Sequence, residues 1–307
     1  APQTVCVPAQ HVRTMCQLLG MNCNTPTDFC FSFRGFAERA GHTDVHKDGW
    51  GVAFYEGRGL RSFLDVLPAA SSPVAKLVRD YPIKTLNMIS HIRYATCGSL
   101  DLHNVHPFNR ELWGKYWTFA HNGDLGPETR RFLAKSVSPY RAVGDTDSEA
   151  AFVYILNELV KLYPNGTPPT TADLYLSVQS LFRQICEREE GCIFNFLLCD
   201  GVDLIVGCWP GSRPGSTVYN GLHYIVREYP FSHAQLADCD CGIDFSEVTT
   251  PDDRVAVIAT KPLTENETWT EMQKGELFVF RDGRPLRSHA ECIDCPLSPT
   301  ARPCPHS

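Results

Sequence analysis

The sequence predicts an α+β fold in which sheets pack between helices. Most of its apolar segments have the length of strands, they fall into two groups along the chain, and two long helical patterns lie between the groups. With 43% hydrophobic and 21% charged residues among 307, the composition is that of a folded globular protein. Because no linker-like stretch divides the chain, we expect one domain of about 270 residues with irregular ends.

The first group combines strands with two helices. Residues 28–40 form a helical pattern that places Phe29, Phe33 and Phe36 on one side. A shorter amphipathic helix is expected over 72–81, and the glycines in the stretch 56–59 favour a turn between two strands. The expected strands cover residues 16–22, 49–55, 60–66, 85–94 and 112–120, the last ending in a turn at His121-Asn122-Gly123.

The clearest helix begins near Thr146. Thr146 and Glu149 fit a capping box, in which the hydroxyl accepts from the first-turn amides and the carboxylate reaches back. Apolar residues then follow at three- and four-residue spacing, until a stretch with three prolines and a glycine, 163–171, ends the helix. A second helix is expected over 172–189.

The second group of strands follows these helices, at 193–199, 204–208, 222–227, 255–260 and 276–280. After Gly283 the chain becomes rich in proline, cysteine and serine, so residues 283–307 are expected to form a weakly ordered tail.

Charge and hydropathy exclude several classes of protein. The 28 basic residues against 35 acidic ones give a net charge of −7, which argues against nucleic acid as a partner. The longest unbroken apolar run, 150–156, is far too short to span a membrane. The 14 cysteines come without a secretory signal, so we expect a cytoplasmic protein with reduced thiols.

Four short segments carry the chemistry: Met15-Cys16-Gln17-Leu18-Leu19-Gly20, His91-Ile92-Arg93-Tyr94-Ala95-Thr96, His121-Asn122-Gly123 and Gly144-Asp145-Thr146-Asp147-Ser148-Glu149. In this order they resemble the class II glutamine amidotransferases, which are N-terminal-nucleophile hydrolases, and most closely the stand-alone YafJ-type members. The resemblance extends over roughly residues 15–281. It implies a four-layer αββα sandwich and release of ammonia from the glutamine side-chain amide, without a cofactor.

The resemblance assigns the nucleophile to Cys16, which would form a γ-glutamyl thioester. A thiol is largely protonated at neutral pH and needs a base, and a free α-amine on the same residue titrates close to that pH. The mechanism therefore requires that residues 1–15 be a leader, a propeptide or a misassigned start. Met15 before a small residue fits a start at that methionine.

Further roles follow from the same resemblance. Asn122 and Gly123 match the two donors of the oxyanion hole. Arg93 matches the residue that binds the glutamine α-carboxylate, with Tyr94 and Thr96 beside it in the pocket. Asp147 matches the carboxylate that binds the α-ammonium, and Asp145 is its nearby competitor.

Metal sites are weaker interpretations, and no metal is expected. His106 and His121 lie near Asp101 and His103, but histidines beside turns commonly serve only as hydrogen-bonding groups. In the tail, zinc could be bound by Cys292, Cys295, Cys304 and His306.

The ammonia acceptor stays open. If the amidotransferase domain covers 16–282, only about 25 residues follow it, too few for a synthase domain. The chain then either passes ammonia to a separate synthase subunit or hydrolyses a γ-glutamyl amide or peptide with the same nucleophile. A third alternative is a catalytically silent regulatory or binding subunit.

Overall fold

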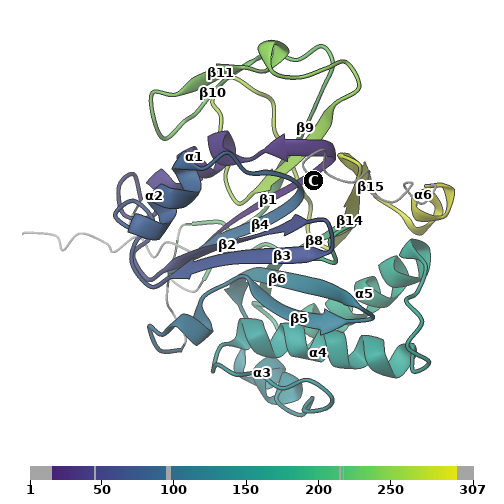
Figure 1. Cartoon of the computed structure of the whole chain (residues 1–307). Helices are drawn as coiled ribbons and strands as arrows, with labels where there is room; N and C mark the ends of the chain where they lie inside the picture. Colours follow the sequence, from purple (N-terminus) through teal and green to yellow (C-terminus); the bar gives the residue numbers. More distant parts are fainter. Residues whose placement is uncertain (1–15, 45, 95–97, 214–215, 217, 296–307) are drawn as a thin grey trace, which may run out of the picture.

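The computed structural model describes residues 16–44, 46–94, 98–213, 216 and 218–295. Two antiparallel sheets face each other, and helices cover both outer faces, as Figure 1 shows. The expected α+β class and the four-layer αββα arrangement are thus confirmed.

The first sheet has the strand order β13-β9-β12-β1-β4-β2-β3. Helices α1 (Cys30–Glu38) and α2 (Pro73–Asp80) pack on its outer face. Its strands are β1 (Gln17–Asp28), β2 (Trp50–Glu56), β3 (Gly59–Asp65), β4 (Lys84–Ile92), β9 (His223–Glu228), β12 (Arg254–Ala259) and β13 (Thr270–Glu271).

The second sheet has the order β15-β14-β8-β7-β6-β5 and packs against α3 (Pro127–Leu133), α4 (Asp147–Leu162) and α5 (Thr171–Cys186). Its strands are β5 (Phe108–Leu112), β6 (Lys115–Asp124), β7 (Ile193–Cys199), β8 (Leu204–Cys208), β14 (Glu276–Arg281) and β15 (Arg284–Leu286). The remaining elements are the hairpin β10 (His233–Gln235) and β11 (Gly242–Asp244), the 3₁₀ turns Leu102–Asn104 and Phe245–Glu247, and α6 (His289–Asp294).

Alternation along the strands fills the space between the sheets. Leu18 and Ile89 of the first sheet meet Ala120 and Leu197 of the second in one buried cluster. Neighbouring residues, one position along each strand, pack on the helices instead. Because side chains alternate, every second residue of β1, β4 or β6 faces the other sheet, and the residues between them face the helices.

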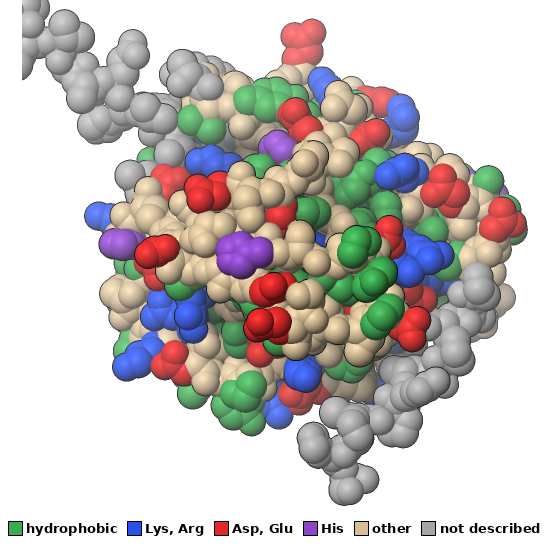
Figure 2. Space-filling view, turned by 90° about the horizontal axis from the view of Figure 1, so that it is seen from above, with side chains coloured by type: hydrophobic (Ala, Val, Ile, Leu, Met, Phe, Trp, Pro, Cys, Tyr) green, Lys and Arg blue, Asp and Glu red, His purple; other side chains and the backbone are tan. Residues whose placement is uncertain are grey.

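The face turned toward the viewer in Figure 2 mixes residue types. Acidic, basic and apolar side chains are interspersed over it. Of the helices in the described part of the chain, none is long and apolar enough to cross a membrane.

Three local expectations were wrong. The segment His121-Asn122-Gly123 lies within β6 rather than in a turn, because its backbone pairs with β7, Asn122 opposite Asn195. The expected strand 112–120 is instead split by a hairpin between β5 and β6, whose turn has positive φ at Trp113 and Gly114. Residues 284–295 are not irregular, since β15 pairs with β14 and α6 follows; residues 296–307 lie outside the described part.

The start of α4 follows the expected capping in part. Thr146 is the N-cap, and its hydroxyl accepts from the Glu149 amide at 3.2 Å. The Glu149 carboxylate reaches farther back than a capping box requires, and it accepts from the amides of Val143 and Gly144. Its other oxygen binds Arg110, so the loop before α4 is fastened to β5.

Candidate active site

Cys16 immediately precedes β1. The first residue of β1, Gln17, pairs with Ile92 of β4. Its thiol lies against the Tyr94 backbone: Sγ is 3.3 Å from the carbonyl oxygen, to which it donates, and 3.2 Å from the amide nitrogen, from which it accepts. Burial raises the pKa of the Cys16 thiol, and the Tyr94 backbone, Arg213 and Arg93 lower it only in part. The thiol therefore needs a base to become a nucleophile at neutral pH.

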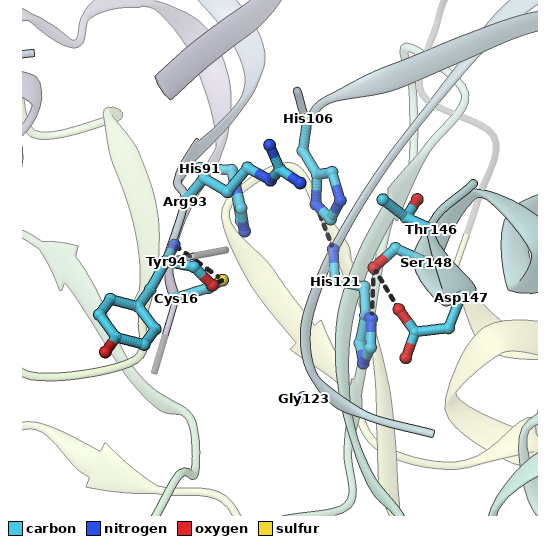
Figure 3. A pocket seen from close by; sticks show the side chains of 10 residues that line it. All are labelled: Cys16, His91, Arg93, Tyr94, His106, His121, Gly123, Thr146, Asp147 and Ser148. Atoms are coloured by element: carbon cyan, nitrogen blue, oxygen red, sulfur yellow. Dashed lines mark hydrogen bonds between the residues drawn. The ribbon is translucent and has the colours of Figure 1, made fainter. Parts of the chain in front are cut away.

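Cys16 lines one small pocket together with residues of β4, β6 and α4, as Figure 3 shows. Its free space is about 30 Å³, which is room for about one water molecule. Among the described residues the lining consists of Cys16, His91, Arg93, Tyr94, His106, His121, Gly123, Thr146, Asp147 and Ser148.

Arg93 follows the end of β4 and is only 3% exposed. Its amide donates to the Gly49 carbonyl at 2.9 Å, which continues the pairing with the segment before β2. The guanidinium Nη1 donates to the Ser99 carbonyl at 2.9 Å. This anchoring holds a cation in the wall of the pocket, close enough to the thiol to lower its pKa.

Gly123 and Asn122 are placed differently. Gly123 lines the pocket, and a Cβ at this position would overlap the Ile193 carbonyl oxygen, so the strand pairing itself requires glycine. Asn122 is fully buried between the sheets. Its Nδ2 donates to Asn220 Oδ1 at 2.8 Å and to Thr260 Oγ1 at 3.1 Å. One of these bonds must break before the Asn122 amide can serve an oxyanion.

Asp147, rather than its competitor Asp145, lines the pocket. It lies in the first turn of α4, where the helix dipole favours an acid. Its Oδ2 accepts from the Leu125 amide at 3.0 Å and lies 3.4 Å from Arg130 Nη2. Asp145 instead accepts from Asn104 Nδ2 at 2.6 Å.

Three histidines form a buried wall of the pocket, the histidine cluster, made of His91, His106 and His121. The rings of His91 and His106 stack with centroids 4.1 Å apart, and His121 Nδ1 lies 2.8 Å from Ser148 Oγ. Burial lowers the pKa of all three, so they are neutral at pH 7. Neither ring nitrogen of His91 has a hydrogen-bond partner among the described residues.

Arg213 belongs to the site and was not predicted. Its Nη2 donates to the Gly123 carbonyl at 3.0 Å, and its Nε lies 3.5 Å from Asp124 Oδ2. The residue lies in the loop between β8 and β9, where no periodicity or motif marks it in the sequence. His91 belongs to the sequence segment around Arg93, but nothing in that segment indicates that its ring nitrogens are without hydrogen-bond partners among the described residues.

The remaining expected residues fall outside the pocket or outside the described chain. Thr96, Cys304 and His306 are not among the described residues. Cys292 is buried in the core between α5 and α6. In the described ranges no group of three or more histidine, cysteine or acidic side chains is arranged to hold a metal ion.

Known proteins resemble this chain along most of its length. Residues 15–301 match the model of the class II glutamine amidotransferases. YafJ of Escherichia coli (strain K12) is 48% identical over 266 residues, which are 87% of this chain and 97% of YafJ. A relative from Haemophilus influenzae is 43% identical over 288 residues, 93% of this chain and 90% of the relative.

Solved structures agree with this. The crystal structure of a predicted glutamine amidotransferase from Pseudomonas aeruginosa has a TM-score of 0.64 and 39% identity, over 89% of this chain and all of the other. The glutamine phosphoribosylpyrophosphate amidotransferase of B. subtilis shares the fold, with a TM-score of 0.53 and 16% identity, over 88% of this chain and 49% of that one. This chain belongs to the class II glutamine amidotransferases, enzymes with the N-terminal-nucleophile hydrolase fold.

Proposed function

We propose that the chain hydrolyses the side-chain amide of glutamine through a γ-glutamyl thioester on Cys16. The observation that carries this proposal is that four residues from separate parts of the chain line one pocket. They are Cys16 before β1, Arg93 after β4, Gly123 of β6 and Asp147 of α4. A nucleophile, a cation, a backbone donor and an anion are the groups that an amino acid with a reactive side-chain amide requires.

The base in this proposal is the α-amine of Cys16, freed by removal of residues 1–15. Burial keeps the pKa of the thiol raised, so the thiolate is scarce without a proton acceptor. An α-amine has an ordinary pKa of about 7.7–8.0, close to the working pH. The described histidines of the pocket are poorer candidates, because burial lowers their pKa.

The steps balance without a cofactor. The α-amine takes the thiol proton as sulfur attacks the amide carbon, and the carbonyl oxygen becomes an oxyanion that accepts from the Gly123 amide. Collapse of this intermediate breaks the C–N bond, and the proton held by the amine goes to the leaving ammonia. Water then attacks the thioester, which yields glutamate and restores the thiol.

Arg93 and Asp147 recognise the head group in this proposal. The guanidinium binds the α-carboxylate in place of its present bond to the Ser99 carbonyl. Asp147 binds the α-ammonium with the carboxylate oxygens that the Leu125 amide leaves available. Loss of either charge should raise KM for glutamine more than it lowers kcat.

The test is ammonia release from glutamine by a chain that begins at Cys16. Cys16→Ala should lower the rate at least about 10³-fold, as removal of a nucleophile does elsewhere. Cys30→Ala, which removes a half-buried thiol on α1, is the matched control and should keep the wild-type rate. Equal rates for Cys16→Ala and the wild type would remove Cys16 from the mechanism.

Two further measurements extend the test. The same chain with residues 1–15 retained should lose activity, because its α-amine is bound in a peptide. Glutamine is then compared with γ-glutamyl amides of larger amines. Faster turnover of those amides would make the chain a γ-glutamyl amide hydrolase, whereas faster glutamine turnover favours delivery of ammonia to a separate synthase.

A further inference from the structure

A second cavity lies on the other side of Asp147. It has a free volume of about 700 Å³, within the range of small-molecule sites, and is bounded by α3, the loop that follows it and the start of α4. Thr146 and Asp147 line both this cavity and the pocket of Cys16. The first turn of α4 is therefore a wall common to the two.

Arg130 connects Asp147 to the second cavity. From α3, its Nη2 lies 2.8 Å from Asp124 Oδ1 and 3.4 Å from Asp147 Oδ2. Arg130 lines the second cavity, whereas Asp147 lines both. Part of the negative charge that Asp147 offers to the catalytic pocket is thus compensated by a cation on the other side.

A second cation, Arg141, lines the same cavity and is exposed to solvent. Arg141 Nε donates to the Val137 carbonyl at 3.2 Å, and no carboxylate lies within ion-pair distance of its guanidinium among the residues that the structure describes. The backbone carbonyl of Arg141, not its side chain, accepts from Arg110. Removal of the side chain should therefore leave the loop attached.

The other charges in the wall are acidic and already hydrogen-bonded. Asp145 accepts from Asn104 Nδ2 at 2.6 Å, and Asp147 accepts from the Leu125 amide. The amino end of α4 adds a partial positive charge on the same side. Apolar side chains complete the lining, among them Leu133, Val137 and Val153.

We propose that this cavity binds an organic anion, a carboxylate with an apolar body, and that its occupancy strengthens glutamine binding. The carboxylate pairs with Arg141 and Arg130 and draws Arg130 away from Asp147. Asp147 then presents more of its charge to the α-ammonium in the adjoining pocket. This coupling rests on the role proposed for Asp147 in glutamine recognition.

Linkage makes the coupling reciprocal: the factor by which the anion tightens glutamine binding equals the factor by which glutamine tightens anion binding. Couplings between sites typically change an affinity about 5- to 150-fold. Both directions can be measured on the chain that begins at Cys16, one by kinetics and the other by calorimetry without turnover.

The kinetic experiment uses hexanoate as the anion and hexan-1-ol as its uncharged counterpart. Hexanoate should lower KM for glutamine about fivefold or more, and hexan-1-ol should leave it unchanged. Arg141→Ala should abolish the effect of hexanoate on KM. Arg61→Ala, which removes an exposed arginine of β3 paired with Glu56, should preserve it. A rise in KM with hexanoate, or an equal response in Arg141→Ala, would overturn the proposal.

The calorimetric experiment separates this proposal from the proposed function. Hexanoate is titrated into the Cys16→Ala variant of the same chain, which begins at position 16, with and without glutamine. Arg141-dependent binding that glutamine tightens supports the coupling even if the wild type releases no ammonia, in which case only the hydrolytic function fails. Absence of hexanoate binding, or binding that glutamine leaves unchanged, overturns the coupling whatever the activity.

Discussion

Thr260 joins β1, the strand that follows Cys16, to the buried Asn122, and its replacement by valine should destabilise the fold. Its hydroxyl oxygen accepts from the Leu18 amide at 2.9 Å and from Asn122 Nδ2 at 3.1 Å. Its amide donates to the Leu18 carbonyl at 3.2 Å, and this bond is independent of the side chain. Valine keeps the shape and the backbone bond but removes the acceptor from two buried donors.

The magnitude follows from the two lost bonds. A buried donor left without an acceptor costs about 1–3 kcal/mol, so the loss of two acceptor contacts in Thr260→Val should lower the free energy of unfolding by about 2–6 kcal/mol. For a domain of this size that is a fall in Tm of about 3–10 °C. Thr260→Ser keeps the hydroxyl and loses one methyl group, so it should cost only about 1 kcal/mol.

Urea unfolding followed by tryptophan fluorescence measures these differences, because Trp50 and Trp117 are both buried. Thr167→Val is the matched control: Thr167 is exposed in the loop between α4 and α5, and its change should stay within about 0.5 kcal/mol. If Thr260→Val proves as stable as Thr260→Ser, the hydroxyl does not satisfy these donors and the reasoning is refuted.

Three other predictions concern stability. Burial lowers the pKa of the histidine cluster, so the unfolded chain binds more protons than the folded chain below about pH 6.5. The free energy of unfolding should therefore fall by about 3 kcal/mol as the pH is lowered from 7.5 to 5.5. A urea midpoint that does not change over this range would contradict the prediction. Arg281→Met leaves the buried Asp203 without its partner at 2.6 Å and should cost about 3–5 kcal/mol by urea unfolding, most of it recovered when Asp203→Leu is added. Gly51→Ala would place a Cβ against the His106 carbonyl oxygen and should lower the free energy of unfolding by more than about 2 kcal/mol. Gly221→Ala, whose Cβ meets nothing closer than 3.5 Å, should be tolerated. Equal Tm values for the two variants would refute the clash.

Most of the layer architecture could be predicted because local pattern and tertiary packing agree. Helix α4 carries both its capping threonine and apolar residues at helical spacing, and it begins within one residue of the expected position. The segment 121–123 failed for the opposite reason. Its Asn-Gly pair favours a turn locally, but pairing with β7 requires an extended backbone, and the long-range interaction prevails.

The site likewise contains residues that local sequence segments indicate and residues that only long-range contacts place there. Cys16, Arg93, Gly123 and Asp147 stand in recognisable segments, and the fold brings them to one pocket. Arg213 reaches the Gly123 carbonyl from a loop about 90 residues away in sequence, and no local pattern encodes such a contact. The partners of Asn122 are equally remote, since Asn220 lies in the loop before β9 and Thr260 follows β12. Such contacts depend on how the two sheets stack, and single sequence segments carry no information about that stacking.

The position of the Cys16 thiol depends on the register of β1 with β4. Gln17 pairs with Ile92, and this register places Cys16 beside Tyr94 and turns it toward the second sheet, as it does Leu18. A slip of one residue would turn the thiol toward the helices and away from the pocket. Thr260, which follows β12, opposes such a slip, because it binds both the amide and the carbonyl of Leu18. Loss of its hydroxyl should therefore lower kcat as well as stability, and Thr260→Ser should restore both.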